Sequence, residues 1–307
     1  MQEFSIRQKL MGSSFELKIV SDREEVASEN LQAGIEEIRR LETMLTEYSE
    51  SSQTSWLNKQ AGIRQVTVDG EVFQLLKRSQ AISKLTQGAF DITAGPLKKI
   101  YRFNNSDFQM PDKAARKEAL SKVGFQHISL RANNKVYLRK KGMHISFAAI
   151  GKGYAADRVR KLWQENGIRA GVINASGDLT VFGKRPDGSA WKVGIANPER
   201  PAEMLCWVPL ENASVATSGD YEQFFMHNGT RYSHNIDPKT GRPLTGIKSA
   251  TIIGPNAELC DALATAVYVM GVEAGLHLVA QLPNIHCLIV DDKNKVWYSK
   301  DLNIERP

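Results

Sequence analysis

Hydrophobic and polar residues alternate along the chain with two periods, one typical of helices and one typical of strands. Between residues 22 and 47, apolar side chains recur every three to four positions, from Val26 to Leu45, and predict a long amphipathic helix. Residues 3–20 instead alternate in steps of two around Met11-Gly12 and predict two short strands. Further helices are expected over residues 71–86, 111–124, 154–167, 258–270 and 272–282, and the serine-rich residues 48–58 are expected to form a loop.

Short strands make up most of the remaining pattern. They are expected near residues 127–130, 135–140, 144–150, 170–176, 191–196, 204–210, 213–217, 223–227, 231–236, 248–254, 286–290 and 296–299. Because many of them follow one another without an intervening helix, we expect an α+β fold of mixed, largely antiparallel sheets packed with helices, not a Rossmann fold. No linker or repeat interrupts the sequence, so a single compact domain over residues 1–307 is expected. If it consists of two closely packed halves, the break lies near 140–150.

Composition and charge narrow the possible functions. The 42% of hydrophobic residues is ordinary for a globular domain, and no apolar stretch reaches the length of about 18 residues that spans a bilayer. The net charge of +6 comes from scattered lysines and arginines. We therefore expect no nucleic-acid partner, although an anionic small ligand would be attracted. The three cysteines have neither the spacing of a zinc site nor that of a disulfide framework, and are expected to be core thiols.

The expected helix 258–270 carries a carboxylate among apolar residues. Asp261 and Thr265 are four residues apart, so their side chains project from the same face of a helix that is apolar on nearly all sides. A buried carboxylate needs hydrogen-bond donors, a proton or a cation. Two interpretations stay open. Either Asp261 caps the helix while the Thr265 hydroxyl bonds back to the preceding turn, or the two side chains hold a hard metal ion.

A glycine-rich turn precedes the expected helix 154–167. Gly151, Gly153 and Ala156 match the pattern G-x-G-x-x-A, which in dinucleotide-binding folds places a phosphate on backbone N–H groups at a helix N-terminus. The β-rich residues that follow argue against a Rossmann unit. A phosphate or pyrophosphate at this helix start therefore remains one interpretation, and close packing permitted by the glycines is the other.

Three more polar clusters lie at expected strand ends and turns. Asp91 stands just before Thr93, Ser218 precedes a glycine, and His234 precedes the Asp-Pro-x-Thr-Gly turn at 237–241. Each residue taken alone is equally consistent with an ordinary turn or strand position.

Taken in order, these segments resemble the flavin transferases of the ApbE family over nearly the whole chain. The matching segments are KLMGSSFELKI, YSESSQTSWLN, GAFDITAGPL, AIGKGYAADRVRKLW, VINASGDL, VATSGDYEQF, YSHNIDPKTGRPL and CDALATAVYVMG. The resemblance implies a flavin transferase domain that uses Mg²⁺ to split FAD. Its FMN moiety passes through its phosphate onto a threonine or serine of another protein, and AMP is released.

The resemblance also implies roles for individual residues. Asp261 and Thr265 would bind Mg²⁺ together with the backbone carbonyl of Ala149, and oxygen ligands suit this ion. His234 would be the general base that removes the proton of the acceptor hydroxyl, a role that contributes about 10²–10⁴-fold to a rate. The implied FAD contacts are Met11, Tyr48, Ala89, Phe90, Asp91, Ser146, Lys152, Ser218 and Ile236.

The sequence departs from the family pattern before the glycine turn. Ser146 stands where the family has an aspartate that touches FAD, and Ala148 and Ala149 replace glycines. Ala149 still offers a carbonyl to a metal, whereas Ser146 can hydrogen-bond but carries no charge. A large gain in FAD affinity from Ser146→Asp would mark the serine as a real loss. Ser176 also replaces a glycine.

FMN transfer to a protein is the leading hypothesis, and two alternatives share the site. They are Mg²⁺-dependent hydrolysis of FAD to FMN and AMP, and non-catalytic binding of FAD. No Asp-x-x-Ser/Thr-Gly-Ala-Ser/Thr acceptor motif occurs in the chain, so the acceptor is expected to be a separate protein, in this family typically a membrane redox subunit. The family context favours an exported, periplasmic or membrane-anchored location although the first residues lack the apolar core of a secretory signal; a cytoplasmic location stays open.

Overall fold

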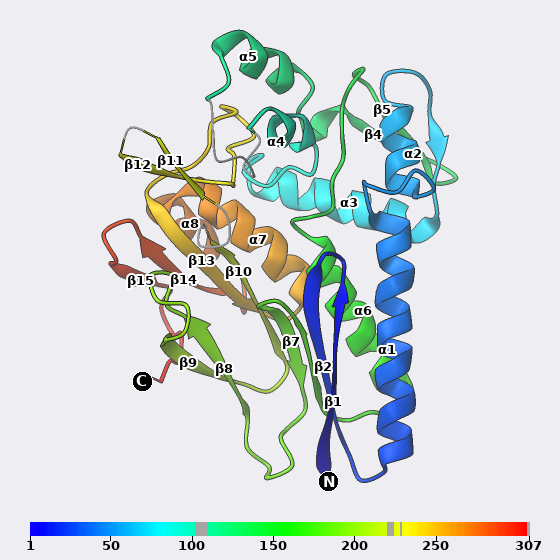
Figure 1. The fold of residues 1–307 in the computed structure, drawn as a ribbon, viewed down its shortest axis with the longest axis vertical. Helices are drawn as coiled ribbons and strands as arrows, with labels where there is room; N and C mark the ends of the chain where they lie inside the picture. The colour runs from blue at the N-terminus through cyan, green and yellow to red at the C-terminus, as the bar shows by residue number, and fades with distance from the viewer. Residues whose placement is uncertain (102–109, 220–223, 228, 306–307) are drawn as a thin grey trace.

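An eight-stranded sheet runs through the centre of the molecule (Figure 1). The computed structural model describes residues 1–101, 110–219, 224–227 and 229–305. The strands follow the order β1-β2-β6-β7-β10-β13-β14-β15, and every neighbouring pair is antiparallel. A doubly wound parallel sheet is therefore ruled out. The strands are β1 (Gln2–Leu10), β2 (Ser13–Ser21), β6 (Gly171–Ala175), β7 (Asp178–Phe182), β10 (Ala213–Gly219), β13 (Ile247–Gly254), β14 (His286–Asp291) and β15 (Val296–Tyr298).

Helices cover one face of this sheet, and a hairpin covers the other. Neighbouring residues of β10 show the two faces: Val215 packs in a cluster with the hairpin, whereas Ala216 packs in a cluster with α7. The stripe predicted on the first long helix is buried, including Ile35 and Leu41. The elements are α1 (Glu24–Leu45), α6 (Gly151–Glu165), α7 (Ala257–Met270), α8 (Val272–Val279), β8 (Trp191–Ala196) and β9 (Met204–Leu210).

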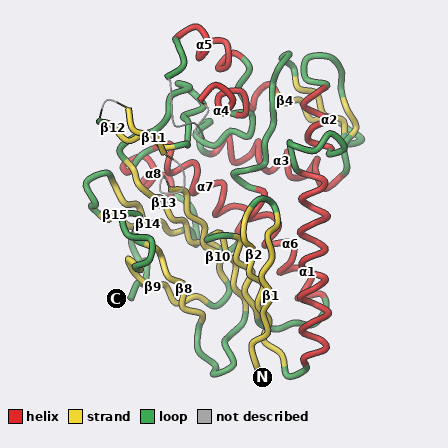
Figure 2. Tube along the Cα trace, viewed as in Figure 1, coloured by secondary structure: helices red, strands yellow, loops and turns green. Residues whose placement is uncertain are grey.

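A group of short elements lies at one end of the sheet (Figure 2). One hydrophobic cluster joins Leu41, Leu76, Val159 and Ala262, and so connects residues before and after 140–150 in a single unit. A boundary between two halves in that region stays a prediction. The end elements are α2 (Gln53–Lys59), β3 (Val66–Thr67), α3 (Gly70–Leu85), α4 (Gly95–Tyr101), α5 (Lys113–Ser121), the 3-10 turn Phe125–His127, β4 (Ile128–Arg131), β5 (Lys135–Leu138) and the hairpin of β11 (Phe224–His227) and β12 (Thr230–Ser233).

Two expected elements are wrong. Residues 48–58 are not all loop, because the Ser52 hydroxyl accepts a hydrogen bond from Ser55 N at 3.0 Å and starts α2. Residues 144–150 do not form a strand: Ser146 N donates to Ile92 O at 2.9 Å, and the chain then turns into α6. β3, β7 and α4 were not expected. Residue 223, the first of the expected strand 223–227, lies outside the described residues.

Helices α6 and α7 cap one another. The Asp157 carboxylate on α6 accepts hydrogen bonds from the N–H groups of Ala257 and Glu258 at the start of α7, at 2.9 and 2.8 Å. The Asp261 carboxylate on α7 accepts one from Gly153 N in the first turn of α6, at 3.2 Å. Each carboxylate thus occupies the positive end of the other helix. Burial still raises the pKa of Asp157 to about 6.

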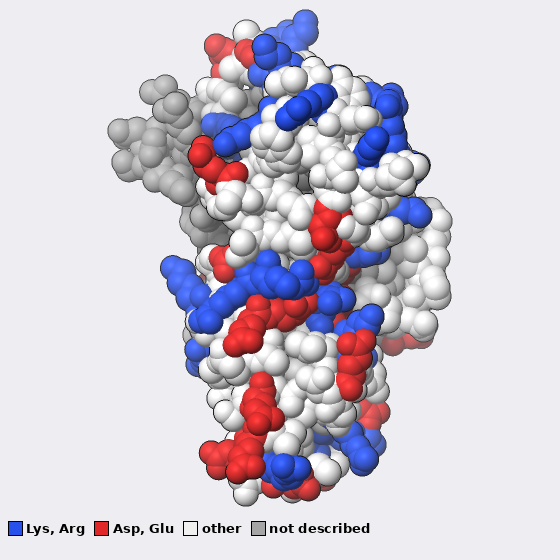
Figure 3. Space-filling view, turned by 90° about the vertical axis from the view of Figure 1, so that its right-hand side faces the viewer, with Lys and Arg blue, Asp and Glu red and all other residues white. Residues whose placement is uncertain are grey.

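Ion pairs on the surface tie α1 to α3 and α6. Arg40 lies 2.8 Å from both Glu37 and Glu71, and Arg158 lies 3.1 Å from Glu37. On the face that carries α1, side chains of both signs are interspersed (Figure 3). In the part of the chain that the structure describes, no helix is both long and apolar enough to cross a membrane.

We expect Gly153→Ala to destabilise the protein, because α6 and α7 meet at this glycine. A Cβ there would lie 2.2 Å from the carbonyl oxygen of Ala257, and overpacking of this kind costs about 1–3 kcal/mol. Gly151→Ala is the matched control, since its Cβ would have no neighbour closer than 3.5 Å. Urea unfolding of both variants checks this. Equal stability would show that the helices can move apart freely.

Candidate functional site

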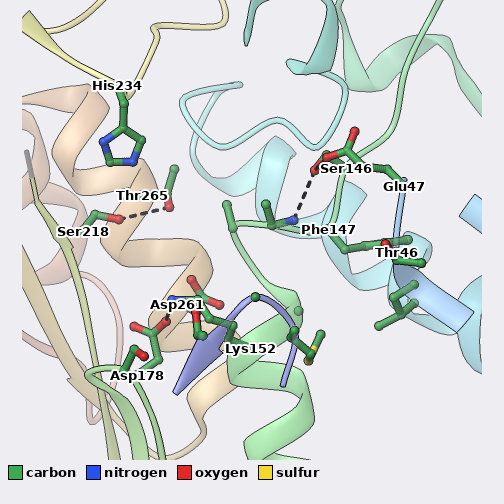
Figure 4. A pocket seen from close by; sticks show the side chains of 18 of the residues that line it. Thr46, Glu47, Ser146, Phe147, Lys152, Asp178, Ser218, His234, Asp261 and Thr265 are labelled. Atoms are coloured by element: carbon green, nitrogen blue, oxygen red, sulfur yellow. Dashed lines mark hydrogen bonds and ion pairs between the residues drawn. The ribbon is translucent and has the colours of Figure 1, made fainter. Parts of the chain in front are cut away.

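A cleft of about 600 Å³ opens between α6, α7, the β1–β2 turn and the segment after β12. It gathers nine of the predicted site residues. Figure 4 shows His234, Ser218 and Thr265 on one side, Asp261, Asp178 and Lys152 beside them, and Glu47 and Ser146 on the opposite side. The nine predicted residues that line it are Met11, Tyr48, Ser146, Ala149, Lys152, Ser218, His234, Asp261 and Thr265.

The other four predicted residues line a smaller cavity next to the cleft, which shares Ser146, Ala149 and Thr265 with it. Asp91 has a structural task there: its carboxylate accepts hydrogen bonds from Thr93 N at 2.8 Å and from Phe125 N at 2.9 Å. Burial raises its pKa all the same. The four residues are Ala89, Phe90, Asp91 and Ile236.

The two aromatic residues expected to meet ring systems differ in access. Phe90 is only 1% exposed, whereas Tyr48 is 90% exposed at the edge of the cleft. A ligand can therefore reach the Tyr48 ring directly, and reaches Phe90 only through the smaller cavity.

The carboxylate inside the apolar helix does not cap its own helix. Asn256 does so, because its side chain accepts a hydrogen bond from Leu259 N. Asp261 lies one turn further along α7, where its carboxylate accepts a hydrogen bond from Gly153 N of α6. The Thr265 hydroxyl likewise does not bond back to the preceding turn but lies 3.2 Å from the Ser218 hydroxyl on β10. The first of the two interpretations is therefore wrong in both details.

Asp261 lacks sufficient compensation for its charge. Burial, followed by the neighbouring Asp178 carboxylate, raises the pKa of Asp261 to about 8 against the opposing effects of Lys152 and the Gly153 N–H. Asp178 itself is paired with Lys152 at 2.5 Å. A further cation next to Asp261 would lower the cost of its charge.

The atoms around Asp261 suit a hard cation such as Mg²⁺. The oxygens that line the cleft here are the carboxylate of Asp261 and the hydroxyls of Thr265 and Ser218. Ala149 lines the same cleft just before α6, with an ordinary backbone conformation that alanine adopts freely. Among the described residues no three His, Cys, Asp or Glu side chains form a metal-binding cluster. The site would thus rely on carbonyl, water and substrate oxygens as well, which is how Mg²⁺ is often held.

Asp178 is a site residue whose role the sequence did not reveal. It is buried at the start of β7, and the preceding turn directs it into the cleft. That turn contains Ser176 with φ +54°, a conformation that favours glycine and so explains why glycine is usual at this position. The Ser176 hydroxyl compensates by bonding to the backbone of Ser14 at 3.1 Å.

His234 and Asn235 follow β12 and precede the hydrogen-bonded turn at 237–241. The Asp237 carboxylate accepts hydrogen bonds from Lys239 N and the Thr240 hydroxyl, at 2.9 and 2.8 Å, so the Asp-Pro turn is confirmed. The buried side-chain nitrogen of Asn235 has no partner among the described residues, and Asn235 lines the cleft. It is therefore a donor available to a ligand.

The three cysteines take no part in this site. Cys206, Cys260 and Cys287 are free and buried, as expected of core thiols.

Comparison with known proteins agrees with this arrangement. A model of the ApbE family matches residues 11–289. The chain belongs to the ApbE family. The resemblance found in the sequence is thereby confirmed. The expected α+β fold is confirmed by the antiparallel sheet with its helices and by its likeness to solved ApbE structures.

Relatives and solved structures cover nearly the whole chain. A protein of Klebsiella pneumoniae named FAD:protein FMN transferase is 33% identical over 96% of this chain and 92% of its own. One of the same name from Treponema pallidum is 30% identical over 96% and 86%. The crystal structure of the ApbE protein of Thermotoga maritima has a TM-score of 0.90 at 31% identity, covering 97% of each chain. That of the Pseudomonas stutzeri flavinyl transferase ApbE has a TM-score of 0.86 at 26% identity, covering 97% of this chain and 95% of that one.

We expect Asp261→Asn to stabilise the metal-free protein at high pH. The folded-state pKa of about 8 lies above the ordinary 3.8, so the folded state keeps a proton that the unfolded chain releases. The stability gained from this bound proton is fully present below the unfolded-state pKa of 3.8 and is lost as pH rises through the folded-state pKa of about 8. In EDTA the variant should therefore have a higher melting temperature than the wild type at about pH 8, and this difference should shrink toward about pH 5.

Magnesium provides the control for this prediction. Mg²⁺ should raise the melting temperature of the wild type but not that of Asp261→Asn. An identical pH dependence of the two proteins in EDTA would contradict it.

Proposed function

We propose that this chain transfers the FMN moiety of FAD to a threonine or serine hydroxyl of an acceptor protein, with Mg²⁺, and releases AMP. The observation that carries the proposal is the joint lining of one cleft by His234, Lys152 and the Asp261–Thr265 pair. The names of its relatives, FAD:protein FMN transferase, support the same reaction.

The proposed step exchanges one phosphorus–oxygen bond for another. The acceptor hydroxyl oxygen forms a bond to the FMN phosphorus, and the bond from that phosphorus to the oxygen bridging to AMP breaks. AMP leaves with the electron pair of the broken bond. The hydroxyl proton passes to His234, which lines the cleft on the same side as Thr265 and Ser218 (Figure 4).

Residues at the start of α6 would hold the pyrophosphate. Lys152 lines the cleft in the first turn of this helix, whose N-terminal N–H groups and dipole favour an anion. Asp261 and Thr265, with the Ala149 carbonyl, would hold Mg²⁺. When bound, the ion would neutralise charge on the pyrophosphate and on the departing AMP.

The proposed partner is a separate protein that carries the acceptor motif, such as a membrane redox subunit. An exported location, in the periplasm or anchored to a membrane, would bring the two together, and this too is a proposal.

The decisive experiment is an incubation with FAD, Mg²⁺ and a small protein that carries the Asp-x-x-Ser/Thr-Gly-Ala-Ser/Thr motif. Intact mass should show one FMN added to the acceptor, AMP should appear, and EDTA should abolish both. FMN and AMP without an adduct would indicate hydrolysis instead. Tightly bound, unchanged FAD would indicate a binding protein.

We expect His234→Ala to slow adduct formation about 10²–10⁴-fold because the acceptor hydroxyl loses its base. FAD affinity, followed by flavin fluorescence, should stay within a few-fold of the wild type. His277→Ala, at an exposed position on α8, is the matched control and should transfer at the wild-type rate. Full transfer by His234→Ala would remove this residue from the mechanism.

A further inference from the structure

A second charged cluster lies across the cleft from Asp261. Its centre is Glu47, two residues after the end of α1, and its other members are Ser146 and His144 (Figure 4 shows Glu47 and Ser146). The Ser146 hydroxyl donates to Glu47 Oε1 at 2.6 Å, and His144 Nε2 bonds to Glu47 Oε2. Both Glu47 and Ser146 line the cleft.

The bonding makes Glu47 an ionised acceptor. Lys99 Nζ lies 3.2 Å from His144 Nδ1. Because an ammonium group only donates, Nδ1 accepts and the ring proton lies on Nε2, which donates to Glu47. Burial raises the pKa of Glu47, but the hydrogen bonds from His144 and Ser146, together with the charges of His144 and Lys98, outweigh this effect, so the pKa falls below its ordinary value. Each carboxylate oxygen keeps a lone pair for a further donor.

The serine-rich stretch after α1 is the frame that holds this carboxylate. The Ser52 hydroxyl donates to Thr46 O, and the Ser55 hydroxyl donates to Glu47 O at 2.9 Å. On the facing segment, both backbone groups of Ile145 bond to the side chain of Asn58, at 2.7 and 2.9 Å. These bonds fix Glu47 and Ser146 relative to each other.

A glycine completes the frame. A Cβ on Gly95 would lie 2.6 Å from the ring of His144, so the imidazole can lie there only because position 95 has no side chain. The cluster is thus built by three separate segments, which a surface ion pair formed by chance does not require.

The order of the hydrogen bonds among Ser146, Glu47 and His144 argues against Ser146 as a nucleophile. In a serine hydrolase the imidazole lies between the hydroxyl and the carboxylate and takes the hydroxyl proton. Here the carboxylate lies between the other two groups, so the Ser146 hydroxyl contacts no imidazole. Its hydrogen-bond acceptor is Glu47, whose lowered pKa makes it a weak base. The cluster presents acceptor atoms to the cleft, and this suits recognition.

A carboxylate is unfavourable beside phosphates and favourable beside neutral donors. With the pyrophosphate at the Lys152 end, the part of the ligand at Glu47 would be a sugar hydroxyl or a ring N–H. We propose that Glu47 is a recognition residue that accepts a hydrogen bond from such a neutral donor of the flavin nucleotide, and that it supplies the charge which Ser146 lacks. The proposal rests on the proposed function and names a further contact of the same site.

The test is a double-mutant cycle on FAD affinity, with binding read by flavin fluorescence. Glu47→Ala should weaken binding about 10- to 100-fold, the range for a hydrogen bond to a charged group. Ser146→Asp alone should weaken binding as well, because two carboxylates would then meet. The double variant Glu47→Ala/Ser146→Asp should return to within about fivefold of the wild type, since one carboxylate again faces the ligand.

Two controls separate recognition from folding and from overall charge. Glu50→Ala removes a carboxylate of the same loop whose side chain is 90% exposed, and should leave FAD affinity unchanged. Affinity for magnesium pyrophosphate, which has no neutral donor, should stay equal or rise in Glu47→Ala.

Several results would overturn the proposal. They are tighter FAD binding by Ser146→Asp alone, no recovery in the double variant, or equal losses for FAD and pyrophosphate in Glu47→Ala. The cycle measures FAD binding alone. A wild type that binds FAD without transferring FMN would therefore overturn the proposed function, but the role of Glu47 in binding could still be tested.

Discussion

The mutual capping of α6 and α7 is the constraint on which the site depends. Asp157 and Asp261 each bind the first turn of the other helix, and Gly153 lets the two backbones approach. This arrangement brings the positive end of α6, the carboxylate of Asp261 and Lys152 to one corner of the cleft. The same carboxylate therefore joins two helices and lines the cleft.

The two ends of the cleft therefore differ in their electrostatic character. Around Asp261 the protein combines a helix N-terminus, Lys152 and a carboxylate that needs a cation, which together suit a phosphate–metal pair. At the other end, the Glu47 carboxylate accepts hydrogen bonds from His144 and Ser146, and the charge of nearby Lys98 also lowers its pKa. An ionised carboxylate disfavours a phosphate next to it. A nucleotide with a charged middle and uncharged ends can lie across such a cleft in few orientations.

Sequence patterns predict the features that depend on residues close together along the chain. The buried stripe of α1 follows from spacing alone, and so does the shared face of Asp261 and Thr265 on α7. The choice between a cap and a ligand could not be made from spacing, because it depends on Gly153, which is 108 residues away from Asp261. Glu47 was missed for the same reason: its partners His144 and Ser146 lie 97 and 99 residues further along the chain. The family resemblance predicted site residues only at positions that match the family's motifs, and Glu47 is not one of them.

The β1–β2 turn has an unusual position for a hairpin tip. Met11 adopts φ +49°, which side chains rarely do, and a Cβ on Gly151 would lie 3.5 Å from the end of the Met11 side chain. Hairpin tips are ordinarily where insertions and tags are tolerated, since they face only solvent. Here the tip reaches over the first turn of α6, so a change in its length would alter the entrance of the cleft while leaving every strand of the sheet intact.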